Sequence, residues 1–431
     1  MSIPAPAQRS APGPGFWLAV TAFLYFPALY QHGYRALQQA QADFPSFHLG
    51  ALAVLTGGVS PYDVEGIRAL AVSQGLDQHV FPFLYPPVSL LPLLPLGMLS
   101  YPRAALLFMV ASQLALLVGA WLACRRLLPG TWHRSNLLEL ASLGYFFLFA
   151  PTLETLDLGQ NNLFAFVCVT GAWIAMRERR ADALAGVLLA VACLFKLYLV
   201  LLLGAALLLR RVRVALWGAG ALTALTALSF LVLPASTWPE WLGRVAPTGG
   251  YGGVPHGLFS PADPVNQSLA GFFARLFLPE DAPLASHVGL CVPLTWAAAL
   301  ATLAASVWGL LRTRRRADLP FELDVGMSVA LLAIYLVAPF SWDHHLVSIA
   351  CVAMVAACRA AGGDPAAGLS AVERVAVVAA VLAVAWELPM GAPFMKHGVG
   401  VLAGSAKFFA VAVLWVSFVA RAAAPRRPRA A

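Results

Sequence analysis

Residues 104–124 read AALLFMVASQLALLVGAWLAC, an unbroken run without a charged side chain, and Arg125 and Arg126 follow directly. About 20 apolar residues are enough for an α-helix to cross the hydrocarbon core of a bilayer. Arginine gathers in the short cytoplasmic loops of membrane proteins, so the pair also indicates which way the helix runs. The run therefore predicts a membrane-spanning helix that ends in the cytoplasm.

The composition of the whole chain extends this prediction. Of the 431 residues, 60% are hydrophobic and 11% are charged, whereas a soluble domain is usually about 45–50% apolar and about 25% charged. So few charged side chains cannot cover a water-facing surface, which excludes a soluble, disordered or coiled-coil protein. The six cysteines form no CxxC pair, which argues against a disulfide framework or a zinc site.

Apolar runs recur along the chain and predict an all-α polytopic membrane protein with about twelve transmembrane helices. We expect a single integral membrane domain, residues 16–420, between a cytoplasmic tail, 1–15, and a basic cytoplasmic tail, 421–431. The predicted spans are residues 16–33, 103–124, 136–152, 163–176, 183–195, 197–209, 214–234, 288–311, 325–340, 345–358, 372–389 and 401–420.

The basic residues orient this topology. When the N-terminus is placed in the cytoplasm, twenty of the 28 lysines and arginines fall on the same side. The positive-inside rule then puts both termini in the cytoplasm. The net charge of +8 is thus a topology signal, and no nucleic-acid partner is expected. A composition rich in alanine and arginine and poor in lysine favours the inner membrane of a GC-rich bacterium.

Two long polar segments, residues 34–102 and 235–287, fall on the external side of this topology, while the cytoplasmic loops are short. Short arginine-rich loops leave little room for a catalytic site, so we expect the chemistry at the external face. In the second segment, residues 249–253 read GGYGG, which is typical of a flexible binding loop or lid.

The first external loop, residues 34–102, carries a helical pattern of its own. Apolar residues recur at helical spacing from Phe44 onward and again from Val64 onward, and Gly57 breaks the chain between them. A third apolar piece, residues 90–99, is expected to dip into the membrane without crossing it. The pattern predicts interfacial helices that lie along the membrane surface.

The start of the second of these helices has a signal of its own. Ser60 is a residue type that caps helix N-termini, and Pro61 follows it where proline commonly opens a helix. We therefore expect this helix to begin at Pro61 with Ser60 as its cap.

Asp43 is the first candidate for chemistry, because it follows the first span at the expected start of an interfacial helix. Partial desolvation at the mouth of a cavity would raise the pKa of its carboxyl group toward the working range of a general base. The alternative is structural, since aspartate is a leading N-cap residue and a helix is expected from Phe44.

Polar residues gather at another outer span end, residues 158–162 (LGQNN), after Glu154. The amides of Gln160, Asn161 and Asn162 could bind sugar hydroxyls. The alternative is a turn that caps the next helix.

Lys196 lies between two short apolar runs, and the next lysine in the chain is Lys396. A cation inside the membrane is a functional hypothesis by default, with an anion as its partner. The alternative is that the side chain snorkels to the interface.

Residues 341–345, SWDHH, lie at the outer end of the ninth span. Adjacent side chains point in different directions, so we expect His344 or His345 to bind phosphate or to orient an acid or base, and not to chelate a metal together. The alternative is interfacial anchoring with Trp342.

Other motifs narrow the reaction class. The sequence has no P-loop, GxGxxG, HExxH or GxSxG motif, so nucleotide hydrolysis and the common hydrolase schemes have no support. Asp63 and Glu65 lie two residues apart, but the first external loop lacks a clustered DxD, and we expect no metal. Asn266-Gln267-Ser268 is formally a glycosylation acceptor and, in a prokaryote, a loop contact.

Taken together, the motifs occur in an order that resembles glycosyltransferase family 87 of the GT-C superfamily, the polyprenyl-phosphate-mannose-dependent mannosyltransferases. The likeness extends from about residue 16 to residue 360, and the last two spans match only in hydrophobicity. The motifs in chain order are Asp43, Gly57-Gly58 to Pro61-Tyr62, Tyr85-Pro86-Pro87, Gly159-Gln160-Asn161-Asn162, Lys196, Asn266-Gln267-Ser268-Leu269 and Ser341-Trp342-Asp343-His344-His345.

The resemblance implies a GT-C-type helical bundle whose first external loop carries the catalytic acid. Asp43 would then deprotonate an acceptor hydroxyl, which attacks C1 of a lipid-phosphate-linked sugar with inversion. Lys196, with His344 or His345, would bind the donor phosphate and stabilise it as it leaves. The residues that would bind the sugar or the acceptor are Tyr85, Gln160, Asn161, Asn162, Asn266 and Gln267.

The resemblance also implies the substrates. The donor would be a polyprenyl-phosphate-linked sugar, and no cofactor or metal is expected. Mannose is the default sugar, with arabinofuranose, glucose and aminoarabinose as alternatives used by related enzymes. The acceptor would be a lipid or a glycan.

Two other functions fit a polytopic protein with a large external loop. A flippase or transporter would line a pathway with polar residues at broken helices, but alternating access requires a site near the midplane. A polymerase or ligase of lipid-linked glycans would be favoured by an arginine-rich external loop, whereas residues 235–287 hold only Arg244 and Arg275.

Overall fold

The computed structural model describes most of the chain, and the residues of that part form helices with no β-strand beyond an isolated bridge between Asn266 and Trp342. Most of the two predicted tails, residues 1–13 and 425–431, lies outside the described residues. The described residues are 14–38, 41–77, 79–128, 136–179, 181–255, 260–277, 289–314, 316–363, 369–389, 392–396 and 398–424.

A helix lies at each predicted span, which confirms the all-α prediction for the described part. These helices are α1 (Pro14–Leu37), α5 (Tyr101–Arg126), α6 (Asn136–Leu148), α8 (Asn162–Glu178), α9 (Asp182–Phe195), α10 (Leu201–Leu208), α11 (Val212–Val232), α14 (Cys291–Thr313), α15 (Pro320–Val337), α16 (Ile349–Cys358), α17 (Ala371–Ala385) and α19 (Ala406–Ala423).

The chain is an integral membrane protein by the length and composition of its helices. Within the described residues, six helical segments are long and apolar enough to cross a bilayer, and the sequence-based count of about twelve spans stays a prediction. The six are Tyr101–Arg126, Val212–Val232, Cys291–Thr313, Pro320–Val337, Asp343–Ala361 and Ala406–Ala423.

The predicted span at 136–152 is not one continuous helix. It breaks at Phe149, and a separate short helix, α7 (Ala150–Leu158), follows with Pro151 in its first turn. Proline cannot donate a backbone hydrogen bond and fits best in the first turn of a helix, so Pro151 favours a helix start just before it. The break gives α7 a direction of its own, and Gly159 (φ +71°) ends it in the left-handed conformation.

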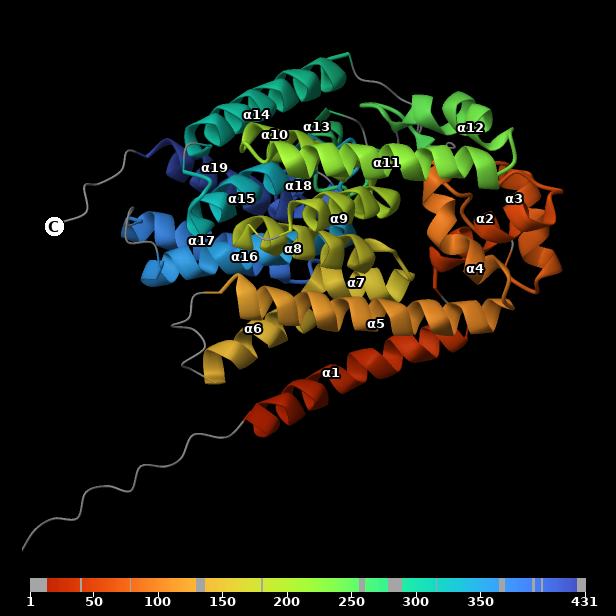
Figure 1. Ribbon diagram of the computed structural model, residues 1–431, viewed down its shortest axis with the longest axis horizontal. Coiled ribbons are helices and arrows are strands. Elements are labelled where there is room, and N and C mark those ends of the chain that lie inside the picture. Colours follow the sequence, from red (N-terminus) through yellow and green to blue (C-terminus); the bar gives the residue numbers. More distant parts are fainter. Residues whose placement is uncertain are drawn as a thin grey trace, which may run out of the picture.

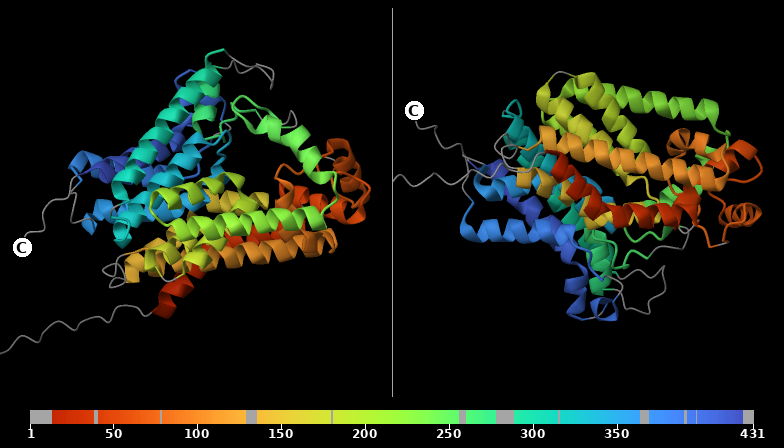
Figure 2. Two further views of the ribbon diagram at one scale, coloured as in Figure 1. Left: turned by 45° about the horizontal axis from the view of Figure 1, so that its top comes forward. Right: turned by 90° about the horizontal axis from the view of Figure 1, so that it is seen from below.

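The first external loop forms the expected helices at one end of the molecule. They are α2 (Phe44–Thr56), α3 (Val64–Ser73), the 3-10 turn η1 (Pro87–Leu93) and α4 (Leu94–Gly97). Figures 1 and 2 show α2, α3 and α4 together at this end, beyond the ends of α5 and α11, while α1 begins and α19 ends at the opposite end. Their placement at a membrane interface stays a prediction.

The sequence predicted the end of α2 correctly but not the start of α3. Gly57 ends α2 with φ +73°, as expected of the glycine pair. The expected start at Pro61 was wrong, because α3 begins at Val64 with Asp63 at its N-cap. Ser60 is used elsewhere, since its hydroxyl donates to Glu240 of the second external loop, in the short helix α12 (Thr237–Glu240).

The arginine-rich helix ends meet one another at the end of the molecule opposite to α2–α4 (Figure 1). Ion pairs join them, and arginines also donate to backbone carbonyls at neighbouring helix ends, as the following examples show. The contacts are Arg126–Glu178 (2.9 Å), Arg177–Asp324 (3.3 Å), Arg421–Glu322 (3.1 Å), Arg211 to the Ala317 carbonyl (2.9 Å) and Arg316 to the Ala422 carbonyl (3.0 Å).

Candidate functional site

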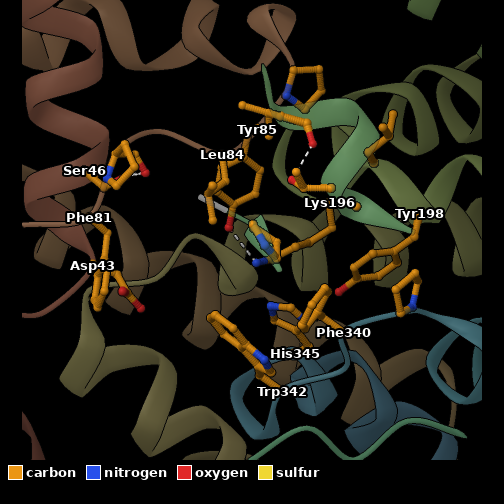
Figure 3. A pocket seen from close by; sticks show the side chains of 18 of the residues that line it. Asp43, Ser46, Phe81, Leu84, Tyr85, Lys196, Tyr198, Phe340, Trp342 and His345 are labelled. Atoms are coloured by element: carbon orange, nitrogen blue, oxygen red, sulfur yellow. Dashed lines mark hydrogen bonds between the residues drawn. The ribbon is translucent and has the colours of Figure 1, made fainter. Parts of the chain in front are cut away.

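A cavity of about 270 Å³ lies where the first external loop meets the helical bundle. Its volume is close to the lower end of the range for small-molecule pockets, about 300 Å³. Figure 3 shows Asp43 on one side, Lys196 and Tyr198 on another, and Trp342 and His345 on a third. The lining side chains come from residues 43–47, 81–86, 160, 196–198, 241–255 and 338–345.

Asp43 occupies the N-cap position of α2, as its structural alternative required, but its side chain makes no capping hydrogen bond. Its Oδ2 atom instead accepts a 2.8 Å hydrogen bond from Gln160 Nε2. The backbone fixes the position, because the N–H of Asp43 donates to the Leu158 carbonyl at 2.9 Å. The carboxylate is therefore held at the cavity wall and is not consumed in capping the helix.

Lys196 separates α9 from the 3-10 turn η3 (Leu197–Val200) and is buried, with 3% of its surface exposed. Its Nζ donates to Tyr85 Oη at 2.7 Å and to Gln160 Oε1 at 3.5 Å, so the side chain does not snorkel to the interface. Tyr85 Oη in turn donates to Gln160 Oε1 at 3.2 Å. A buried ammonium group needs polar partners, and here the partners are neutral.

Burial sets the electrostatics of the cavity wall. It raises the pKa of Asp43 above the ordinary carboxyl value, and the charge of His344, the hydrogen bond from Gln160 and the charge of Lys196 only partly oppose it. Burial also raises the pKa of Tyr85, so its phenol stays protonated and donates to Gln160. A raised carboxyl pKa suits a group that takes up a proton near neutral pH.

The two candidate histidines face different surroundings. His345 lines the cavity, and its ring stacks on that of Trp342 with centroids 5.8 Å apart. His344 is buried, and its Nδ1 lies 3.8 Å from Glu154 Oε1. Burial raises the pKa of Glu154 to about 7, against the charge of Lys407 and a hydrogen bond with Asp343. Of the two histidines, His345 is the one that lines the cavity.

Besides His344, four of the predicted site residues do not line the cavity. Asn161 is buried, and its side chain hydrogen-bonds to Tyr85. Asn162 Nδ2 donates to the His344 carbonyl at 2.8 Å. Asn266 accepts from the Ser341 N–H at 3.0 Å, and Gln267 Nε2 donates to the Gly404 carbonyl at 2.8 Å. The last three amides thus hold loops and helix ends together.

Sequence reasoning missed several aromatic residues of the lining, among them Tyr198 and Trp241. Tyr198 lies in η3, two residues after Lys196. Trp241 follows α12, and its Nε1 donates to the Leu84 carbonyl at 3.2 Å, which ties the second external loop to the first. From the glycine-rich segment 249–253, Gly249 lines the cavity. The signals available in the sequence were the place of Tyr198 two residues after Lys196 and that of Trp241 in the long polar segment 235–287.

The described part of the chain contains no group of three His, Cys, Asp or Glu side chains that could hold a metal ion. The expectation that the site works without a metal stays a prediction.

Comparison with known proteins gives two relatives and one family. Both relatives are polyprenol-phosphate-mannose-dependent α-(1-2)-phosphatidylinositol mannoside mannosyltransferases. The protein of Mycobacterium tuberculosis is 29% identical over 280 residues, which cover 62% of this chain and 60% of the relative. The protein of Mycolicibacterium smegmatis is 27% identical over 341 residues, which cover 75% and 72%. This chain thus spans only part of each relative's length.

The family model for glycosyltransferase family 87 matches residues 83–339, which is more than half of the chain. The matched residues include Tyr85, Gln160 and Lys196, whereas Asp43 and His345 lie outside the match and reach the same cavity through the fold. The chain belongs to glycosyltransferase family 87.

Proposed function

We propose that the protein transfers a sugar, mannose, from a polyprenyl-phosphate-linked donor to a lipid or glycan acceptor at the external face of the membrane. The observation that carries the proposal is the pairing of Asp43 and Lys196 across one cavity, with Gln160 bridging them. A carboxylate and an ammonium group are what an inverting transfer from a lipid phosphate requires. The names of the two relatives support mannose and the polyprenyl-phosphate carrier.

In the proposed reaction Asp43 takes the proton of an acceptor hydroxyl as the oxygen attacks C1 of the donor sugar. The bond between C1 and the phosphate oxygen breaks, and the phosphate leaves with the electron pair on the opposite face, so the configuration inverts. General-base catalysis of this kind contributes about 10²–10⁴-fold to a rate.

The leaving phosphate gains negative charge, and Lys196 lies in the cavity wall with only neutral partners, Tyr85 and Gln160. An anion near its Nζ would be stabilised most as the charge develops, which lowers the barrier and not only the ground state. His345 offers a second donor on the same cavity. Tyr85 also shapes the sugar subsite, while Asn161, Asn162, Asn266 and Gln267 are not part of this proposal.

Two features favour transfer over the alternative of a flippase. The cavity lies at the end of the bundle that carries α2, whereas alternating access requires a site near the midplane. The potential base, Asp43, also lines the same small cavity as the cation, Lys196.

The test is transfer from radiolabelled polyprenyl-phosphate mannose to candidate lipid acceptors by the purified full chain in vesicles. We expect Asp43→Asn to lower kcat by at least about 100-fold. Asp63→Asn is a matched control, since Asp63 is also an N-cap aspartate without a capping hydrogen bond. Equal transfer by Asp43→Asn and wild type would refute the assigned base. Movement of the donor across the bilayer without transfer would favour a flippase.

A further inference from the structure

The start of the last helix holds one wall of the cavity through a buried ion pair. Lys407, in the first turn of α19, is fully buried, and its Nζ lies 2.6 Å from Asp343 Oδ1 and 2.5 Å from Asp343 Oδ2. Asp343 opens the 3-10 turn η7 (Asp343–Ser348) between two residues of the lining, Trp342 and His345. Neither member of the pair touches the cavity.

A second connection joins the same two segments. Gln267 Oε1 accepts from the N–H of Phe408 at 2.8 Å, and the N–H of Gln267 donates to the Ser341 carbonyl at 2.7 Å. Gln267, in the loop before α13 (Leu269–Phe277), therefore binds both Phe408, next to Lys407, and Ser341, near Asp343. Two independent links converge on residues 341–343, which include Trp342 of the cavity wall.

The energetics favour a role in geometry. Removing two charges from water costs several kcal/mol per ion, so a buried ion pair contributes little net stability compared with apolar residues of the same volume. What the ion pair provides is a fixed distance and direction between its two charged groups, and so between α19 and η7. A cavity wall that is misplaced by about 1 Å can slow a reaction by about 100-fold.

We propose that Lys407 and Asp343 are positioning residues for the sugar transfer: together they fix the Trp342–His345 wall against which the reacting sugar is held. The inference rests on the proposed function. Both residues lie outside the part of the chain that matches the family model, residues 83–339. The ion pair thus adds a dependence of the site on the C-terminal helix.

The experiment compares two double variants of the full chain. Lys407→Met with Asp343→Asn removes both charges of the pair, so neither is left buried without the other. Arg421→Met with Glu322→Gln is the matched control, because this buried ion pair (3.1 Å) also involves α19 but lies at the arginine-rich end. For each variant we measure kcat, the donor KM and the melting temperature.

We expect the first double variant to lose kcat by about 10- to 100-fold with a smaller change in donor KM, because Lys196 is untouched and only the second donor, His345, shifts. The control double variant should show a similar change in melting temperature but a kcat equal to that of the wild type. Equal kcat in the two double variants, or losses that only follow the melting temperature, would overturn the positioning role.

A single variant keeps the test decisive if the first double variant does not fold. Lys407→Arg retains the charge but brings a larger, planar group into a fully buried site, so we expect a lower melting temperature and, measured well below it, a several-fold lower kcat. Wild-type kcat in Lys407→Arg would refute the inference. If the wild-type protein itself transferred no sugar, the proposed function would fail instead, so the two failures are distinguishable.

Discussion

Asp43 and Lys196 are joined through the carboxamide of Gln160, which donates to Asp43 Oδ2 at 2.8 Å and accepts from Lys196 Nζ at 3.5 Å. A direct ion pair would hold the carboxylate deprotonated at low basicity and would occupy the cation. The amide keeps the two charges in one cavity while leaving each able to meet its own substrate group.

The hydrogen bond from Gln160 favours the charged form of Asp43, against the burial that raises its pKa. Gln160→Leu removes that bond at similar volume, so the pKa of Asp43 should rise further. A base works only when deprotonated, and the acidic limb of the rate profile should therefore move to higher pH. The measurement is kcat/KM against pH for wild type and variant. A limb that stays in place would contradict the role of Gln160 beside the base.

Lys196→Met removes the buried cation and keeps an unbranched apolar stem. We expect the donor KM to rise and kcat to fall, with a smaller change in the acceptor KM, because the lost charge faces the donor phosphate. Tyr85→Phe is the control, since it removes a neutral partner of Nζ (2.7 Å) and leaves the charge. Inhibition by polyprenyl phosphate, the leaving group, should weaken in Lys196→Met and persist in Tyr85→Phe. The reverse order would rule out phosphate binding by Lys196.

Gly159 and Gly57 offer a matched pair of substitutions. Both have positive φ, +71° and +73°, so alanine at either position is strained by about 1–2 kcal/mol. A Cβ at Gly159 would lie 2.8 Å from Phe44 Cβ, whereas no described atom lies within 4 Å of a Cβ at Gly57. Gly57→Ala should lower the melting temperature and keep kcat.

Gly159→Ala should lower both quantities, because Phe44 must move and Asp43 precedes it directly. Steady-state kinetics and thermal unfolding of the two variants separate strain from displacement. A kcat for Gly159→Ala equal to that of Gly57→Ala would show that the base tolerates movement of α2.

The orientation of the site can be tested by labelling, because all six cysteines are buried. An impermeant maleimide applied to intact cells should therefore report single introduced cysteines. We expect Ser73→Cys, exposed at the end of α3, to react from outside, and Arg213→Cys, exposed in α11, to react only after permeabilisation. Labelling with the opposite preference would place the cavity in the cytoplasm and remove the basis of the proposed donor.

The sequence predicts the helices well because apolar runs of span length have few other solutions in a bilayer. It also singles out Asp43, Gln160 and Lys196, since polar groups at outer span ends are rare. It cannot show which way a polar side chain points. Asn266 and Gln267 are of the same residue types as Gln160, yet they bind backbone groups of Ser341 and Gly404.

Long-range partners are the other limit of sequence reasoning. Lys407 stands in an apolar helix, and its partner Asp343 lies 64 residues earlier in the chain. Nothing local to either residue indicates the pair. The same holds for Ser60, whose local signal as a helix cap was overridden by a hydrogen bond to Glu240, 180 residues away.

The contacts among the arginine-rich helix ends have a consequence for how the protein enters the membrane. Arg211 and Arg316 donate to the backbone carbonyls of Ala317 and Ala422, so the residues that would retain these loops in the cytoplasm during insertion later bind helix ends to one another. Sorting and assembly thus draw on the same guanidinium groups. Replacing Arg211 and Arg316 with lysine would keep the positive charges that orient the loops but would weaken the hydrogen bonds between the helix ends. Membrane insertion and the packing of the helices could then be observed separately.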